Sequence, residues 1–578
     1  MRPVEECDHF LLQRPMTKAL AIGPSDRVHD TRLPLVVGIA ADRGLTAEAA
    51  QRAEEPVARI LAGMCGLYRA TPFLLLVQLP EALRRSAEQL AATLDADVVD
   101  LEEHFAPALV PPGGAGATDP RSGACEDVTR RATFLADQCH LVIVISDSRG
   151  TAPGGLADQI IQFRLQGIPD RHKGRPLQLD SVGLGSVHHV VAGTSGEAAV
   201  ADASASTFLR PQIETAFGSE ELDDAAAWDH LERFNADVAK QWQRGPRAAI
   251  SPPQGQPLTA LSGQAWIGDR FAVADALAVR FQRATHATML ALLVLGLAAA
   301  LAFQLSGVFS HSPPIYTACL ALAYGCYLWA YWQRYEHRFH DYRALAEGLR
   351  VQMHWSAAGI TARASDYYLR RQRSELDWIR QALRAWTLTA RTAPTASAPS
   401  DLARRAPGQV LEEWVDDQWN YYSQAARRRQ AMGTWLNRVA KGFFLLGLLL
   451  AGTRPLFHGN VAFNVAIGLA PVVAALLYVY THTRAFLEQA RQYDRMSSLF
   501  GNARRRLRQA LAEGDLETFR GLLLDLGKEA LRENGDWVLL HRERPISFGE
   551  ARSWIQAGSW ILGVCSRRRK GKGRSQPQ

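Results

Sequence analysis

Short apolar runs alternate with amphipathic stretches of helical spacing in the first third of the chain. Continuous apolar runs of four to eight residues are typical of strands that are buried on both faces. Because strands that alternate with helices form parallel sheets, residues 31–195 are predicted to fold as a doubly wound α/β domain. The predicted strands are Pro34–Ala40, Pro72–Leu79, Asp97–Leu101, Leu141–Ser146 and Val187–Val191.

Longer apolar stretches follow in the second half of the chain. About 20 helical residues are needed to cross the ~30 Å of hydrocarbon in a bilayer. The third stretch is the weakest, because Arg454 and Pro455 cut it short, and a buried core helix is the alternative there. Short turns separate the stretches into pairs, which predicts two transmembrane hairpins, at residues 286–332 and 442–481. The four stretches are Ala287–Leu305, Ile315–Trp332, Gly442–Ala451 and Val461–Tyr480.

Basic residues predict the orientation of these hairpins. The turn between the first two stretches has no Lys or Arg, and the turn between the last two has only Arg454. Because positive residues stay on the cytoplasmic side, both termini are predicted to be cytoplasmic. This topology excludes a receptor for an external ligand. The basic residues on the other sides are Arg280, Arg283, Arg334, Arg338, Arg438, Lys441, Arg484 and Arg491.

The remaining segments are predicted from pattern and composition. Tyr335, Phe339 and Tyr342 begin a coiled-coil-like seam, which predicts packing on another helix of this chain or of a partner subunit, and hence a homo-oligomer. The other segments are a flexible N-terminus at 1–30, linker and helices at 196–285, cytoplasmic helical segments at 333–441 and 482–565, a linker at 391–408 and a disordered basic tail at 566–578.

Composition and charge limit the class of protein. With 47% hydrophobic and 21% charged residues, the chain is not mainly disordered. The net charge of +7 is small for 578 residues, and no aromatics interleave the basic tail, so nucleic acid is not an expected partner. The seven cysteines are scattered, without a CxxC pair or histidines at metal spacing. We therefore expect no disulfide, metal or cofactor.

Two loops that follow predicted strands carry candidate chemistry. The first, Gly38–Gly44, contains Gly38, Asp42 and Arg43. Glycines before a helix let backbone N–H groups approach an anion, and arginines form charge-assisted bonds to phosphate. Two such loops at the carboxyl ends of parallel strands predict a phosphate site, whereas the alternative is a tight turn with solvated arginines. The second loop, Asp147–Asp158, contributes Arg149, Gly150, Thr151, Gly154 and Gly155.

The same loops resemble a known family. PGGLAD at Pro153–Asp158 resembles the phosphate loop of the SLOG superfamily, a Rossmann-like group, and GIAADR at Gly38–Arg43 resembles its first loop. LPEALRR at Leu79–Arg85 resembles its L-A-E-G-A-D-R segment. The resemblance implies a Rossmann-like fold and a nucleotide-type ligand. Enzymes of the group carry a Glu after a fuller PGG-x-G-T motif, where this chain has Asp158 and lacks the second glycine, so binding is favoured over hydrolysis.

Three stretches of the helical segments also resemble a known group: Asp341–Ile360, Tyr368–Arg384 and Asn534–Pro545. They are similar to the SLATT group of two-span membrane modules, which accompany SLOG domains in bacterial conflict systems. Together the two resemblances imply an effector of the bacterial inner membrane that senses a nucleotide or related phosphorylated molecule and alters membrane permeability. Lipid and further copies of the chain are then partners. The alternatives are a membrane-anchored, phosphoribohydrolase-like enzyme, with Asp158 as catalytic residue, and a channel or transporter.

Overall fold

The computed structural model divides the chain into two compact units. Unit 1 contains the chain up to Val273 together with Arg380–Ala398, and unit 2 contains Ala274–Ile379 and the chain from Pro399. The predicted N-terminal segment 1–30, most of the linker 391–408 and the basic tail 566–578 lie outside the described residues. The structure describes residues 31–42, 44–104, 120–147, 151, 153–172, 183–192, 204–215, 218–222, 224–244, 265–306, 309, 311–369, 376–392, 407–456 and 460–542.

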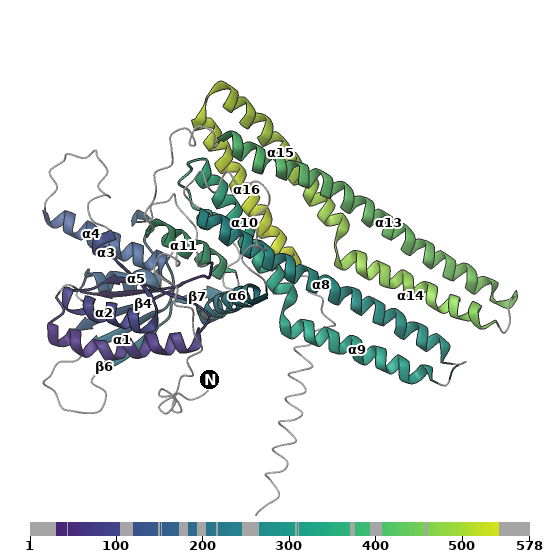
Figure 1. Ribbon diagram of the computed structural model, residues 1–578, viewed down its shortest axis with the longest axis horizontal. Coiled ribbons are helices and arrows are strands. Elements are labelled where there is room, and N and C mark those ends of the chain that lie inside the picture. The colour runs from purple at the N-terminus through teal and green to yellow at the C-terminus, as the bar shows by residue number, and fades with distance from the viewer. Residues whose placement is uncertain are drawn as a thin grey trace, which may run out of the picture. The chain divides into compact units, whose positions relative to one another are not determined.

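A six-stranded sheet forms the centre of unit 1 (Figure 1). Its order is β3-β2-β1-β4-β5-β6, and all neighbours pair in parallel except β6, which is antiparallel to β5. Every residue of β1 and β2 is buried, as the apolar runs predict. The five predicted strands are confirmed as β1 (Leu35–Ala41), β2 (Phe73–Gln78), β3 (Asp97–Asp100), β4 (Leu141–Asp147) and β5 (Val187–Ala192).

The sheet continues beyond residue 195, where the sequence predicts linker and helices. β6 adds an edge strand, and a small hairpin of β7 and β8 and a helix, α6, follow it. Half of the residues in the run SASTFL of β6 are polar, which hides it from an apolar pattern, and an edge strand with hydrogen bonds on one side tolerates such polarity. The bounds are β6 (Ser204–Leu209), β7 (Gln212–Thr215), β8 (Gly218–Glu221) and α6 (Asp224–Arg244).

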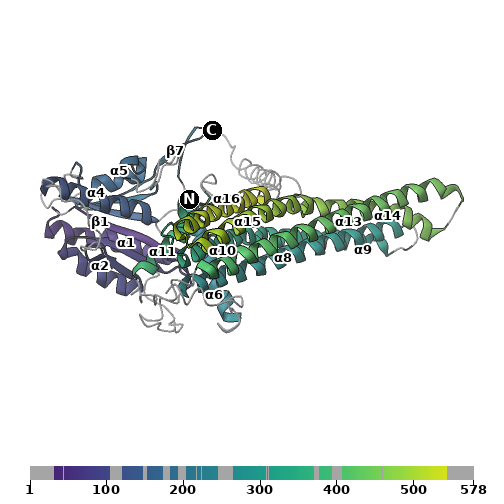
Figure 2. The same cartoon turned by 90° about the horizontal axis from the view of Figure 1, so that it is seen from above.

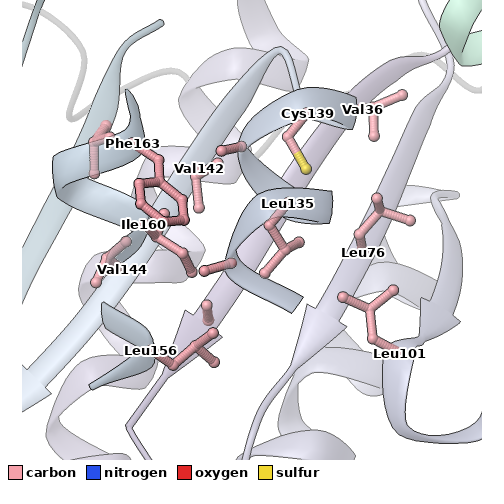
Figure 3. Close-up of a cluster of buried hydrophobic side chains, with 14 of the residues drawn as sticks. Val36, Leu76, Leu101, Leu135, Cys139, Val142, Val144, Leu156, Ile160 and Phe163 are labelled. Carbon is pink, nitrogen blue, oxygen red and sulfur yellow. The ribbon is translucent and has the colours of Figure 1, made fainter. Parts of the chain in front are cut away.

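Helices cover the sheet on both faces (Figures 1 and 2). Helices α1 and α2 lie on one face, and α4 and α5 lie on the other, where Leu135, Ile160 and Phe163 pack on Val142 and Val144 (Figure 3). The helix α11 contributes Ala385 and Leu388 to this buried cluster, although it follows the first predicted hairpin in sequence. The bounds are α1 (Ala47–Leu67), α2 (Glu81–Leu94), α3 (Leu101–His104), α4 (Pro120–Gln138), α5 (Leu156–Gln166), η3 (Asp170–His172) and α11 (Asp377–Thr392).

Long helices make up unit 2. Helix α8 has 41 residues, or about 60 Å at 1.5 Å per residue, so it is twice as long as a bilayer core is thick. Helix α13 packs on α14 and α15, while α16 packs on α10 and α15. The bounds are α8 (Ala265–Leu305), α9 (Ser312–Gln333), α10 (Tyr335–Ala357), η5 (Ala364–Asp366), the π-helical η6 (Leu411–Asp416), α13 (Asp417–Thr453), η7 (Arg454–Leu456), α14 (Val461–Thr483), α15 (Phe486–Glu513) and α16 (Leu516–Arg542).

Three helices are long and apolar enough to cross a membrane, by length and composition. They contain the first, third and fourth predicted stretches. The short stretch Gly442–Ala451 is the outer part of the 37-residue helix α13, and its Leu445 and Leu449 are exposed, so it is not a buried core helix of this chain. The second stretch lies in α9, whose four tyrosines and two tryptophans make it less apolar than the other three.

The predicted seam on α10 packs within the chain, which is one of its two predicted arrangements. Tyr342 is buried, with its ring centroid 5.6 Å from that of Phe281 on α8. The Phe339 ring lies 6.0 Å from that of Trp537 on α16. The predicted homo-oligomer therefore has to form through another surface.

Candidate functional site

The order of the strands reverses between β1 and β4, and the two predicted loops follow these neighbouring strands. Ligands of open parallel sheets bind outside the carboxyl ends of the strands at such a point. The loops touch, because Asp42 Oδ1 accepts a hydrogen bond of 3.0 Å from the backbone N–H of Ala157 in α5. The structure thus brings the residue after β1 to the start of the helix after β4.

The turn before α5 is held by the first turn of the helix itself. Gly154 has a φ of +72°, a left-handed conformation that favours glycine. Asp158 Oδ2 accepts from the backbone N–H of Gly154 at 2.9 Å and from Gln162 Nε2 at 3.2 Å. Gln159 Nε2 donates to the Gly154 carbonyl at 2.9 Å. These bonds give Asp158 a role in shaping the loop.

The start of α5 retains hydrogen-bonding capacity for an anion. Gly155 is the N-cap, and the Asp42 carboxylate already accepts from Ala157. In the described parts of the chain, the N–H groups of Leu156 and Asp158 have no hydrogen-bond partner. The Asp42 carboxylate would repel a phosphate at this position, so a phosphate site here would require a cation nearby.

The predicted basic partners fall on residues outside the described ones. These basic partners are Arg43 and Arg149. Gly150, another predicted site residue, also lies outside the described residues, whereas Thr151 is described and half-buried. Gly38 lies in the middle of β1, where the sequence places the start of a loop. A Cβ at Gly38 would be only 2.8 Å from Cys139 Sγ, so this glycine permits the chain at the end of α4 to approach the sheet.

A second polar group lies beside this point, at the ends of β2 and β3. Arg84 forms ion pairs of 2.8 Å with both Asp100 and Glu102. Arg131 donates to Gln78 Oε1 at 2.9 Å, and Gln78 is aligned with Ala40 of β1. Arg84 belongs to the LPEALRR stretch that the sequence singles out, but its partners are too distant in sequence to form a motif. Within this group, the positive charges of Arg84 and Arg131 are balanced by the carboxylates of Asp100 and Glu102.

The other titratable groups of this sheet are structural. His189 Nε2 and Ser146 Oγ are 2.8 Å apart, and burial lowers the pKa of both His188 and His189, so both stay neutral near pH 7. Burial raises the pKa of Cys139 to about 12, which keeps its thiol protonated. Within the described ranges no group of three or more His, Cys, Asp or Glu side chains is placed to hold a metal ion.

Two aromatic residues of unit 2, Trp355 and Tyr368, are packing residues. Trp355 and Tyr368 are fully buried, and the Tyr368 hydroxyl donates to the Ala344 carbonyl at 3.0 Å. Burial raises the pKa of Tyr368 well above its ordinary value.

No protein-family model, curated protein or solved structure matches this chain.

Proposed function

We propose that the chain is a multi-pass effector of the bacterial inner membrane. Its Rossmann-like, SLOG-like domain binds a nucleotide or related phosphorylated molecule at the loops after β1 and β4. Its SLATT-like helices assemble with further copies in response and alter membrane permeability. One observation carries this proposal: two separate parts of the chain belong to unit 1. The second part contains α11, which follows the first hairpin in sequence and adds Ala385 and Leu388 to the buried core that includes β4. A change at the sheet edge thereby reaches the chain between the two hairpins.

Exposed apolar side chains support the membrane part of the proposal. Leu448 and Leu449 on α13 are 63% and 67% exposed, and Leu290 on α8 is 61% exposed. Contiguous apolar surface of this kind is not tolerated in water and marks contact with lipid or with another subunit. The four apolar stretches carry no charged residue, which argues against an ion- or proton-coupled transporter.

The path of the chain supports four crossings. Arg343 of α10 forms an ion pair of 2.9 Å with Asp275, in the polar first half of α8. Because α9 joins the outer end of α8 to α10, α9 and the first turns of α10 together have to run back along α8 for the same distance. Likewise Arg504 of α15 lies 2.6 Å from Asp416, just before α13, so α14 and the first part of α15 together return the chain to its starting level. Both hairpins then leave the termini on one side, which the flanking basic residues assign to the cytoplasm.

The test measures nucleotide binding and turnover by the full-length protein in detergent, with nucleoside mono-, di- and triphosphates as probes. We expect stoichiometric binding without turnover. Gly155→Val should abolish binding, because its side chain occupies the space in which a phosphate approaches α5. Arg43→Ala should weaken binding by about 1.5–3 kcal/mol through loss of a charge-assisted bond. Gly66→Val is the control, since a Cβ there has no neighbour within 4 Å.

The alternatives are separated in the same assay. Turnover by the wild type that Asp158→Asn abolishes would establish the nucleotide-processing enzyme. Unchanged binding by both Gly155→Val and Arg43→Ala would show that the site is elsewhere. Wild-type protein that binds no nucleotide, yet conducts ions constitutively in vesicles, would favour the channel or transporter.

A further inference from the structure

A cavity of about 410 Å³ lies within unit 2, at the polar ends of the helices that form the two hairpins. Helix α8 of the first hairpin lines one side of it, and α13 and α15, which flank the second hairpin, line another. Its volume is within the range of small-molecule sites, about 300–1,000 Å³. A ligand in this cavity contacts helices from both hairpins at once.

Aromatic rings form part of the wall. The ring centroid of Tyr422 lies 5.3 Å from that of Tyr421 and 5.7 Å from that of Tyr493. Trp537 of α16 lines the cavity as well. Such rings offer flat apolar faces with polar edges, which suit the carbon skeleton of a ligand that also carries polar groups.

Several charges of the wall neutralise one another. Arg343 lies 2.9 Å from Asp275, and Arg350 lies 2.8 Å from Glu347. Burial alone lowers the pKa of Arg343, but the carboxylates of Glu347 and Asp275 outweigh it and raise that pKa above its ordinary value. The first pair joins α8 to α10, and the second lies within α10. The remaining charged residues of the wall are Asp417, Arg429 and Glu533.

Two other arginines lack such partners. Arg429 of α13 lines the cavity, and its Cζ lies 5.5 Å from the ring centroid of Phe486. Arg484, just after α14, lies 5.7 Å from the same ring and repels Arg429. Among the described residues neither guanidinium has an ion pair or a hydrogen bond, and Nε of Arg484 is buried. Two adjacent cations that are partly desolvated without an anion are costly, which indicates that a counter-ion belongs there.

The pair lies at the level where the apolar part of α14 ends. Arg484 follows the stretch Val461–Tyr480 by four residues. A Cβ at Gly433 of α13 would touch Phe486 at 3.0 Å, which places Arg429, one helical turn before Gly433, at the same level. In the proposed topology this is the cytoplasmic surface of the membrane, where anionic headgroups collect.

We propose that this cavity binds a phosphate-bearing ligand. Its phosphate lies at the edge of the cavity, between Arg429, which lines it, and Arg484, which lies beside it at the Phe486 ring, and the rest of the ligand lies against Tyr421, Tyr493 and Trp537. The inference rests on the proposed membrane placement of α14, but it does not depend on the sheet-edge site of unit 1. An anionic phospholipid headgroup and a soluble phosphate compound share this chemistry. Because the ligand bridges both hairpins, its occupancy stabilises their packing.

The experiment uses delipidated full-length protein in neutral detergent at constant ionic strength, with thermal unfolding as the readout. One arm adds dioleoylphosphatidylglycerol to the micelles, with dioleoylphosphatidylcholine as reference, and the other adds inorganic pyrophosphate to the buffer. We expect a saturable rise in unfolding temperature in at least one arm. Arg429→Gln and Arg484→Gln should each raise the apparent dissociation constant about tenfold or more.

The matched control is Arg428→Gln, which removes the same charge from an exposed neighbour on α13 that contacts Gln424. Its affinity should equal that of the wild type. Arg429→Lys keeps the charge and tests the site if the glutamine variants do not fold. Absence of saturable stabilisation of the wild type by either probe overturns the proposal, as does equal binding by all the variants. Gly155→Val removes the proposed phosphate site of unit 1, so saturable stabilisation that persists in this variant and is lost on adding Arg429→Gln belongs to the cavity. Failure of this site and failure of the nucleotide site therefore give different results.

Discussion

Asn235 is the buried polar residue on which the start of the sheet in unit 1 depends. It has 0% exposure, its Oδ1 accepts from the backbone N–H of Leu33 at 2.7 Å, and its Nδ2 donates to the Leu33 carbonyl at 2.9 Å. The same Nδ2 donates to Thr71 Oγ1 at 3.0 Å. One amide on α6 thus satisfies backbone groups on the chain that leads into β1.

Asn235→Ala should destabilise unit 1 by about 3 kcal/mol, because it leaves buried backbone groups of Leu33 without hydrogen bonds. Thermal unfolding of the detergent-solubilised protein measures this as a lower unfolding temperature. The exposed Asn420 of α13 provides the control, and Asn420→Ala should leave the transition unchanged. Equal transitions in the two variants would contradict the role assigned to Asn235.

His354 of α10 makes the stability of unit 2 depend on pH. Its ring stacks on Trp414 at 4.9 Å, with 4° between the planes. Burial, and then the charge of Arg350, lowers its pKa to about 3. In the unfolded chain the pKa of this histidine is near 6.5. Between about pH 3 and pH 6.5 the unfolded chain therefore binds a proton at His354 that the folded chain does not bind. The stabilising effect of the neutral imidazole is therefore complete above pH ~6.5 and declines as the pH falls toward 3.

His354→Phe should weaken this pH dependence, because it keeps the stacked ring and removes the titrating group. We expect the fall in unfolding temperature between pH 7 and pH 4.5 to be smaller in the variant than in the wild type. Linkage allows up to roughly 1.4 kcal/mol per pH unit for one group. A variant with the same decline as the wild type would show that other groups cause it.

At the scale of elements, glycines allow helices of the two hairpins to pack closely. A Cβ at Gly468 of α14 would be 1.9 Å from Gln304 Nε2 on α8, and a Cβ at Gly296 of α8 would be 3.8 Å from Leu476 Cδ2 on α14. Between α13 and α14, Gly447 of α13 faces Pro471 of α14. Small residues at crossings are how helices associate in lipid, where no hydrophobic force drives them together.

Gly468→Leu should separate α8 from α14, because its side chain overlaps Gln304. In a cysteine-free background, the pair Gly296→Cys and Leu476→Cys should form an intramolecular disulfide, and Gly468→Leu should reduce its yield. Gly452→Leu is the control, since no atom lies within 4 Å of a Cβ there. Efficient cross-linking in the Gly468→Leu protein would contradict this packing.

At the scale of the whole molecule, the proposed topology has four crossings with both termini in the cytoplasm. Reporter fusions after Gly307 and after Asn460 should be external, and a fusion after Ser400 should be cytoplasmic. The physical reason is the placement of basic residues at one end of each hairpin. An external Gly307 fusion together with a cytoplasmic Asn460 fusion would mean that α13 does not cross, and a cytoplasmic Gly307 fusion would mean the same for α8.

The strands and long helices could be predicted from sequence because their burial leaves a local pattern. The strands β1 and β2 are buried on both faces, and α8, α13 and α14 are long and apolar enough to cross a membrane. The two loops at the carboxyl ends of β1 and β4 follow from the same pattern. The edge strand β6, half of whose residues are polar, could not be predicted in this way, because hydrogen bonds to β5 rather than apolar burial stabilise it.

Contacts between distant residues were decided only by the tertiary structure. The bond from Asp42 to Ala157 joins residues 115 positions apart, and α11 adds its Leu388 to a core formed by the first 200 residues. The cavity likewise gathers Arg429, Tyr493 and Trp537 from three separate helices. Such contacts depend on which faces of the packed elements meet. No periodicity along the chain encodes that choice, whereas burial of a strand or a membrane helix is encoded residue by residue.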